Sequence, residues 1–73
     1  MDKFAIKNNI RRLRFDHDEM TQQQLAEKAG VTRQTIVAIE KGNYSPSLEL
    51  AFRFALIFNV PLEEVFFIDT NNP

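Results

Sequence analysis

The sequence lacks cysteine and tryptophan and contains a single histidine, His17. Without cysteine the chain can form neither a disulfide framework nor a thiolate metal site, which agrees with a cytoplasmic protein. One histidine cannot build a histidine-based metal cluster. The chain also lacks the run of about twenty apolar residues that would span a membrane, and its start lacks the basic-then-apolar pattern of a signal peptide. We therefore expect no membrane partner and no export.

Net charge is also almost absent, at −1 at pH 7 in a chain of 73 residues. That length fits one small domain, which we expect to span residues 1–73. The weak total charge predicts modest non-specific affinity for nucleic acid. The charges are unevenly placed, however, because basic residues are concentrated in residues 1–14 and none follows Arg53. One face of the domain can therefore still be positive toward DNA.

The most informative stretch of the chain is residues 21–42, which has the pattern of two short helices joined by a tight turn. Thr21 and Gln24 form a capping box at the start of the first helix. Gly30 ends that helix, because glycine adopts a left-handed conformation without steric penalty. Between them, apolar residues recur at helical spacing at Leu25, Ala26 and Ala29.

The second helix of this stretch begins after Thr32, whose hydroxyl can cap it, and ends at Gly42. Ile36 and Ile39 face inward at helical spacing. The side chains left on the outward face are Arg33, Gln34, Thr35 and Val37. Two short helices joined by a short turn that contains glycine form a helix-turn-helix unit.

These residues resemble the Xre/Cro-like class of phage-repressor helix-turn-helix regulators. The matches are the glutamine that begins the first motif helix, the small residue where the helices cross, the turn glycine and two buried positions of the recognition helix, here Gln22, Ala26, Gly30, Ile36 and Ile39. The run at residues 43–51 looks like the Gly-x-Tyr-x-Pro-Ser-Leu run of a compact subset of the family. The resemblance covers roughly residues 7–66, which we take as the core of the domain. It implies an all-α fold, a compact five-helix bundle containing the helix-turn-helix.

Three further helices complete this bundle. We expect the first at residues 7–16 with Asn8 or Asn9 as its cap, the fourth after Ser47 through Phe58, and the last at residues 62–66 with Pro61 at its first position. The inward residues of the first helix are expected to be Ile6, Ile10 and Leu13, and those of the fourth Leu48, Ala51, Phe54, Ala55 and Phe58.

The two ends of the chain are both β-prone. Phe4 and Ile6 alternate with Ala5, and the other end carries Phe66-Phe67-Ile68-Asp69. One interpretation is a small antiparallel pairing of the two ends as strands. The alternative is a frayed tail, which is the usual fate of chain termini.

The outward residues of the second motif helix are the candidate base contacts, because such a helix fits the DNA major groove. Arg33 can form paired hydrogen bonds with guanine and Gln34 with adenine. Val37 suits a thymine methyl group, and Thr35 suits a base or a phosphate. The alternative is that the three polar residues are only solvated, which explains the outward valine less well.

Phosphate contact requires donors that do not read sequence. The candidates are Gln22, Gln23, Thr32, Lys41, Asn43, Tyr44, Arg14 and Arg11. Gln22 lies at a helix start, whose free N–H groups attract anions. The alternative for the arginines is a solvated helix face, and Tyr44 can also be half-buried with its hydroxyl in water.

Apolar residues remain after the core positions are filled, among them Phe52 and Leu56 of the fourth helix. Leaving several in water is unfavourable, since burying one contributes about 1.5–3 kcal/mol. We therefore expect a homodimer, with an interface of Leu62, Phe66, Val65 and Ile57. The alternative is that residues 66–68 only pack on the N-terminal strand.

We conclude from the sequence that the chain is a DNA-binding transcriptional regulator, a repressor that binds double-stranded palindromic operator DNA as a homodimer. We expect no cofactor, metal or small-molecule ligand. The rival interpretation is a protein-interaction module of the same fold, for example an antitoxin component. An enzyme is disfavoured because no nucleophile–base pair or metal set is present, and the acidic residues 16–19 around His17 are interpreted as a polar loop.

Overall fold

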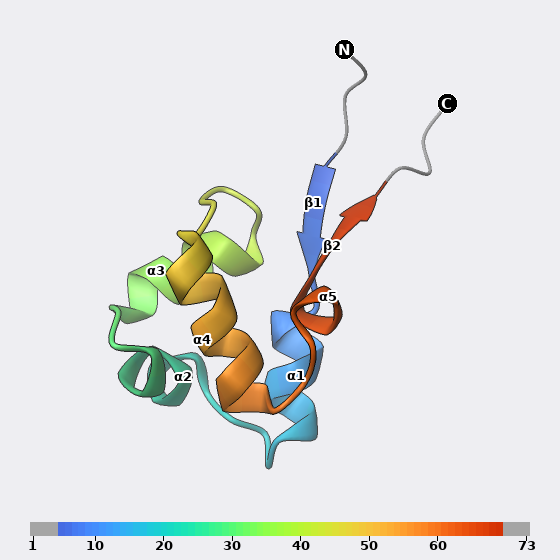
Figure 1. The fold of residues 1–73 in the computed structure, drawn as a ribbon. Coiled ribbons are helices and arrows are strands. Elements are labelled where there is room, and N and C mark those ends of the chain that lie inside the picture. Colours follow the sequence, from blue (N-terminus) through green and yellow to red (C-terminus); the bar gives the residue numbers. More distant parts are fainter. Residues whose placement is uncertain (1–4, 70–73) are drawn as a thin grey trace.

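The structure is a computed structural model that describes residues 5–69, so Phe4 of the expected strand lies outside the described residues. Five helices and two strands lie within this range (Figure 1). In chain order they are β1 (Ala5–Asn8), α1 (Ile10–Asp16), α2 (Gln22–Ala29), α3 (Arg33–Glu40), α4 (Leu48–Phe58), α5 (Leu62–Val65) and β2 (Phe66–Asp69). The expected helical bundle with a small terminal sheet is confirmed. None of these helices has the length and apolar composition that crossing a membrane requires.

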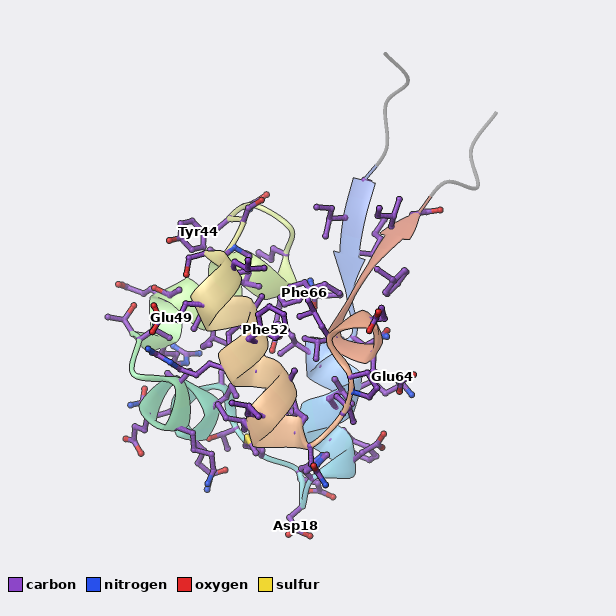
Figure 2. The ribbon with its side chains drawn as sticks, viewed as in Figure 1. Asp18, Tyr44, Glu49, Phe52, Glu64 and Phe66 are labelled. Carbon is purple, nitrogen blue, oxygen red and sulfur yellow. The ribbon has the colours of Figure 1, made fainter. Side chains whose placement is uncertain are left out.

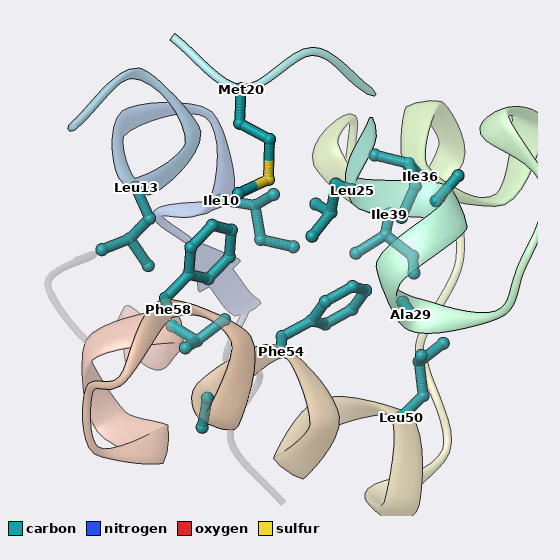
Figure 3. Close-up of a cluster of buried hydrophobic side chains, with 13 residues drawn as sticks. Ile10, Leu13, Met20, Leu25, Ala29, Ile36, Ile39, Leu50, Phe54 and Phe58 are labelled. Carbon is teal, nitrogen blue, oxygen red and sulfur yellow. The ribbon is translucent and has the colours of Figure 1, made fainter. Parts of the chain in front are cut away.

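The core is centred on two aromatic side chains of α4, Phe54 and Phe58, which lie one helical turn apart and are almost completely buried. Figure 3 shows both rings pointing into a cluster supplied by the other helices. The remaining members of the cluster are Ile10, Leu13, Met20, Leu25, Ala26, Ala29, Ile36, Ile39, Leu50, Ala55 and Val65. The long apolar helix α4 is therefore the element against which the others pack.

The helix ends follow the capping rules that the sequence indicates. Thr21 and Gln24 form the expected capping box, and the side chains of Thr32 and Ser47 cap α3 and α4. Gly30 adopts a left-handed conformation with φ of 77° at the end of α2. These caps depend on neighbours in the chain, which is why local sequence is sufficient to predict them.

The chain ends pair as antiparallel strands, with Asn8 opposite Phe66 and Ala5 opposite Asp69. This two-stranded ribbon extends away from the helices (Figure 1). The expected start of the first helix at Lys7 was wrong, because Lys7 and Asn8 belong to β1. The Asn8 side chain then accepts a hydrogen bond from the Ile10 backbone N–H at 3.1 Å, and α1 begins there. Asn9 holds the N-cap position without a side-chain bond.

Two inward positions were predicted wrongly. Ile6 is exposed and lies opposite Ile68 in the ribbon instead of in a helical stripe. Leu48 is 70% exposed, and Leu50 is buried in its place. The buried stripe of α4 runs through Leu50, Phe54 and Phe58, so Leu48, two positions earlier, faces a different side of the helix.

The last helix is also shorter than expected. Pro61 occupies its N-cap with ψ of 156°, not its first helical position. α5 ends at Val65 because Phe66 adopts an extended backbone and pairs with Asn8. Strand pairing with a distant segment therefore decides where this helix stops.

Candidate nucleic-acid interface

Helices α2 and α3 pack against each other and are joined by a turn of three residues, Gly30, Val31 and Thr32 (Figure 1). The backbone N–H groups of Gly30 and Val31 both donate to the Ala26 carbonyl, at 2.9 and 3.0 Å. Val31 is half-buried and packs on the core. The turn is fixed by its own hydrogen bonds, and this sets the angle between the two helices.

The side of α3 that faces away from the core carries the candidate base contacts. Arg33 and Gln34, in the first turn, are exposed, whereas Val37 one turn later is half-buried. The Thr35 and Thr32 hydroxyls lie 3.0 Å apart and bond to each other, and Thr32 also accepts from the Thr35 backbone N–H. The free polar groups at the start of α3 are therefore the guanidinium of Arg33 and the amide of Gln34.

Three helices meet beside Val37 and form a hollow of about 410 Å³. Its walls include Arg11 from α1, Gln22 from α2 and Lys41 just after α3. These residues are widely separated in the sequence. The structure thus brings three of the candidate phosphate contacts next to a candidate base contact. We call Arg11, Gln22, Arg33, Gln34, Val37 and Lys41 the α3 surface.

Arg14 also lines this hollow, but its guanidinium is directed into the protein. Its Nε and Nη2 donate to Oε2 and Oε1 of Glu40 at 2.7 and 3.1 Å, and its Nη1 donates to the Met20 carbonyl at 2.8 Å. The side chains of Arg14 and Glu40 are only 14% and 11% exposed. Since Nε, Nη1 and Nη2 of Arg14 already have partners inside the fold, its guanidinium is not free to bind a DNA phosphate.

Glu40 is a site residue that sequence reasoning missed. It accepts from Arg14 of α1 and also from the Gln22 amide of α2 at 3.2 Å, so it joins three helices at the last residue of α3. Charge-assisted bonds of this kind are stronger than neutral ones. Arg14 and Glu40 are 26 residues apart, and no local pattern links residues at that distance.

Of the remaining candidate phosphate contacts, Gln23 belongs to α2, and Asn43 and Tyr44 belong to the loop after α3. Gln23 is exposed, and its amide donates to Glu27 at 3.1 Å. The exposed Asn43 donates its backbone N–H to the Ala38 carbonyl. Tyr44 projects from the loop between α3 and α4 (Figure 2). It is about half exposed and lines an apolar groove of about 340 Å³.

Only two of the four residues predicted for the dimer interface line this groove. Leu62 and Phe66 line it, as do Ile6 and Leu48. Ile57 is half-buried against the core, and Val65 is fully buried. Placing Val65 in the interface was therefore wrong, because the core already covers it.

An exposed apolar stripe on α4 borders the same groove. Leu48, Phe52 and Leu56 are 70%, 50% and 80% exposed and lie at successive helical turns. Leu62 lies between the groove and a second hollow beside Phe52 and Leu56. Within the described part of the chain, residues 5–69, no charged residue lines either hollow. We call Leu48, Phe52, Leu56 and Leu62 the α4 surface.

The acidic connector between α1 and α2 has Asp16, Asp18 and Glu19 exposed, with Asp18 at its outer tip (Figure 2). Its Glu19 lines a shallow hollow together with Arg11 and Gln22 of the α3 surface. Within residues 5–69, no three acidic or histidine side chains are grouped as a metal ion requires. The structure thus contains one polar and one apolar surface.

Comparison with known proteins agrees with this geometry. The helix-turn-helix family model matches residues 10–65. The chain is 52% identical over 61 residues to an uncharacterised HTH-type transcriptional regulator, MJ0272, of Methanocaldococcus jannaschii, covering 84% of this chain and 91% of that protein. It is 43% identical over 67 residues to the uncharacterised HTH-type transcriptional regulator YgzD of Bacillus subtilis, covering 92% and 100%.

A third relative has a more specific name. The chain is 38% identical over 60 residues to the cryptic phage CTXphi transcriptional repressor RstR of Vibrio cholerae, covering 82% of this chain and 53% of that protein. The family match includes both motif helices, the turn and the helices that pack on them. The chain therefore belongs to the Xre/Cro-like helix-turn-helix family of DNA-binding transcriptional regulators.

Proposed function

We propose that the protein is a sequence-specific repressor that acts in the cytoplasm and binds a palindromic operator as a homodimer. The observation that carries the proposal is the pair of free, exposed side chains, Arg33 and Gln34, in the first turn of a helix held rigidly at both ends. A capped N-terminus fixes the start of that helix, and the Glu40 network fixes its end. Side chains on such a rigid base can select one arrangement of base edges.

Base reading is assigned to three side chains of α3. Arg33 donates in pairs to guanine O6 and N7, and Gln34 pairs with the N6 and N7 groups of adenine. Val37 approaches a thymine methyl group from the side of the hollow. Thr35 has a secondary place, because its hydroxyl already bonds to Thr32.

Phosphate contacts are assigned to the rim of the α3 surface. Arg11 and Lys41 supply the positive charge. The first backbone N–H groups of α2, beside Gln22, donate to a DNA phosphate. The exposed Gln23, Thr32, Asn43 and Tyr44 extend this rim. Two cations per protomer predict a modest salt dependence, because each neutralised phosphate releases counterions.

The homodimer is assigned to the α4 surface together with the groove walls Leu62 and Phe66. Its exposed apolar side chains would each contribute about 1.5–3 kcal/mol on burial. A two-fold axis through this surface makes the same patch serve both copies. It would set the two α3 helices about 34 Å apart, which is one turn of DNA. A role as repressor is supported by the name of the Vibrio relative, a transcriptional repressor.

The test is selection from a random duplex library with wild-type protein and Arg33→Ala in parallel. The expected result is a wild-type palindrome with half-sites about one turn apart, and a motif that is relaxed at one position for the variant. If neither protein enriches any sequence, the proposal is overturned. The α4 surface would then favour the rival function, a module that binds another protein.

A further inference from the structure

Phe15 is an exposed aromatic residue near the end of α1. It is 67% exposed, although Ile10 and Leu13 of the same helix are buried in the core. The other exposed large apolar side chains among residues 5–69 belong to the α4 surface, to the apolar groove or to β2. A homodimer through the α4 surface therefore does not explain this exposed ring, which a partner would gain by covering.

Two adjoining hollows connect Phe15 to the α3 surface. Phe15 stands one helical turn after Arg11, so both side chains lie on the same side of α1. They line a shallow hollow of about 400 Å³ together with Thr21 and Gln22 at the start of α2. Arg11 and Gln22 also line the hollow beside Val37. The surface around Phe15 is thus continuous with the surface proposed to contact DNA.

The backbone that carries Phe15 is held in place. The Phe15 carbonyl accepts a hydrogen bond from the Glu19 backbone N–H at 3.1 Å. Two residues after Phe15, the His17 Nε2 lies 3.0 Å from the Phe58 carbonyl oxygen of α4. The end of α1 is therefore tied both to the connector and to the central helix. A ring on such a fixed base is preorganised for a contact and loses little freedom when it is covered.

The charges around Phe15 favour a polyanion as its partner. A further hollow, which Phe15 also lines, adds Arg12 to this surface. Apart from the ion pair in the Glu40 network, the charged residues among residues 5–69 that line the three hollows are Arg11, Arg12, Lys41 and Glu19. Three cations against one carboxylate give this surface an excess of positive charge, which attracts the DNA backbone.

The DNA backbone also has the apolar part that the ring requires. Its phosphates accept hydrogen bonds from cations and N–H groups. The deoxyribose between two phosphates presents C–H groups, which an aromatic ring can cover. In the hollow shared by Phe15 and Gln22, a phosphate at the start of α2 would place the adjoining sugar toward the ring.

We propose that Phe15 packs on a deoxyribose of the operator backbone, next to the phosphate bound at the start of α2. The ring supplies an apolar contact that is independent of base sequence. Glu19 lies in the same hollow and repels the neighbouring phosphates, so it opposes binding. The inference rests on the function proposed above and adds one attractive and one repulsive residue to its backbone contacts.

The first experiment titrates wild type, Phe15→Ala and Phe67→Ala against the selected duplex and a scrambled duplex at several salt concentrations. Phe15→Ala should weaken binding to both duplexes by about three- to tenfold. The salt slope should stay unchanged, because an apolar contact releases no counterion. Phe67 is exposed on β2 and lines none of the three hollows, so Phe67→Ala should bind like wild type.

These titrations distinguish two kinds of failure. If wild type binds the duplexes and Phe15→Ala binds them equally well, the sugar contact is wrong and the proposed function stands. If wild type binds neither duplex, the proposed function fails and the contact fails with it. A changed salt slope for Phe15→Ala would also overturn the contact, because the ring would then act through a charged neighbour.

The second experiment compares two substitutions that remove the same charge. Glu19→Gln removes it from the hollow, and Asp18→Asn removes it from the outer tip of the connector, where Asp18 lines none of the three hollows (Figure 2). At low salt, Glu19→Gln should raise the affinity for both duplexes about two- to fivefold, and Asp18→Asn clearly less, because distance and screening weaken its repulsion. Equal gains, or no gain, would mean that the DNA backbone does not pass over this hollow.

A measurement on wild type alone covers the case in which Phe15→Ala does not fold normally. In a complex of isotope-labelled protein with an unlabelled duplex, the Phe15 ring protons should show nuclear Overhauser contacts to deoxyribose protons. Ring signals that are unchanged from the free protein, with no contact to any DNA proton, would contradict the proposal.

Discussion

The α3 and α4 surfaces differ in how their exposed side chains are supported. On the α3 surface, exposed polar groups stand on a helix whose buried side is fixed by Ile36, Ile39 and the Glu40 network. On the α4 surface, apolar groups stand on the central helix of the core, and no charged residue among residues 5–69 lines the hollows beside them. The α3 surface suits sequence-selective contact with a polar ligand such as DNA. The α4 surface suits burial against an apolar partner.

The largest effect is expected for Leu56→Asp, which tests the α4 surface. Leu56 is 80% exposed, so the monomer should fold normally, whereas a two-fold interface would lose the contact twice. We expect a cost to dimer formation of about 3–6 kcal/mol, measured by sedimentation equilibrium. Glu63→Asp, at an exposed residue that borders neither hollow, is the control. A dimer that survives Leu56→Asp would place the interface elsewhere.

The second prediction concerns the support beneath the α3 surface. Glu40→Gln should destabilise the fold by about 2–4 kcal/mol, because it leaves the nearly buried Arg14 cation without its partner. The matched control is Glu49→Gln, which removes the exposed ion pair with Arg53 and should change stability by less than about 1 kcal/mol. Urea unfolding measures both. Equal effects would mean that the buried network has no special role.

The third prediction distinguishes a base contact from a phosphate contact on the α3 surface. Arg33→Ala should lower the affinity for the best site by about 1–3 kcal/mol and relax one base position. Lys41→Ala should instead weaken all sequences alike and reduce the salt slope by about one. Titrations against the selected site and a scrambled duplex distinguish the two. Equal losses on both duplexes for Arg33→Ala would remove it from the base contacts.

The smallest effect is expected in the connector between α1 and α2. Glu19 has φ of 53°, so Glu19→Gly should relieve left-handed strain and stabilise the fold by no more than about 1 kcal/mol. Thermal unfolding measures the change. A lower midpoint would show that the Glu19 side chain, although exposed, stabilises the connector.

The sequence predicts what depends on neighbours in the chain. The capping box at Thr21, the cap at Thr32 and the left-handed Gly30 are set by residues within one turn, and all three are confirmed. The resemblance added the order of the five helices, which the family match supports.

The errors have a common physical cause, which is contact between distant segments. Pairing with β2 converted the expected first turn of α1 into β1 and ended α5 before Phe66. The partners of Arg14 and His17 lie 26 and 41 residues away. Leu48 was misplaced for a different reason, since two apolar stripes run along α4 and only packing decides which one is buried.

The most direct measurement is the stoichiometry of the complex with the selected operator, by sedimentation of wild type and Leu56→Asp on full-site and half-site duplexes. The account predicts two wild-type protomers bound together on the full site, one on the half-site, and a variant that binds both duplexes with half-site affinity. A single wild-type protomer on the full site, or cooperative binding that Leu56→Asp leaves intact, would contradict the division between a surface that reads DNA and a surface that pairs two copies.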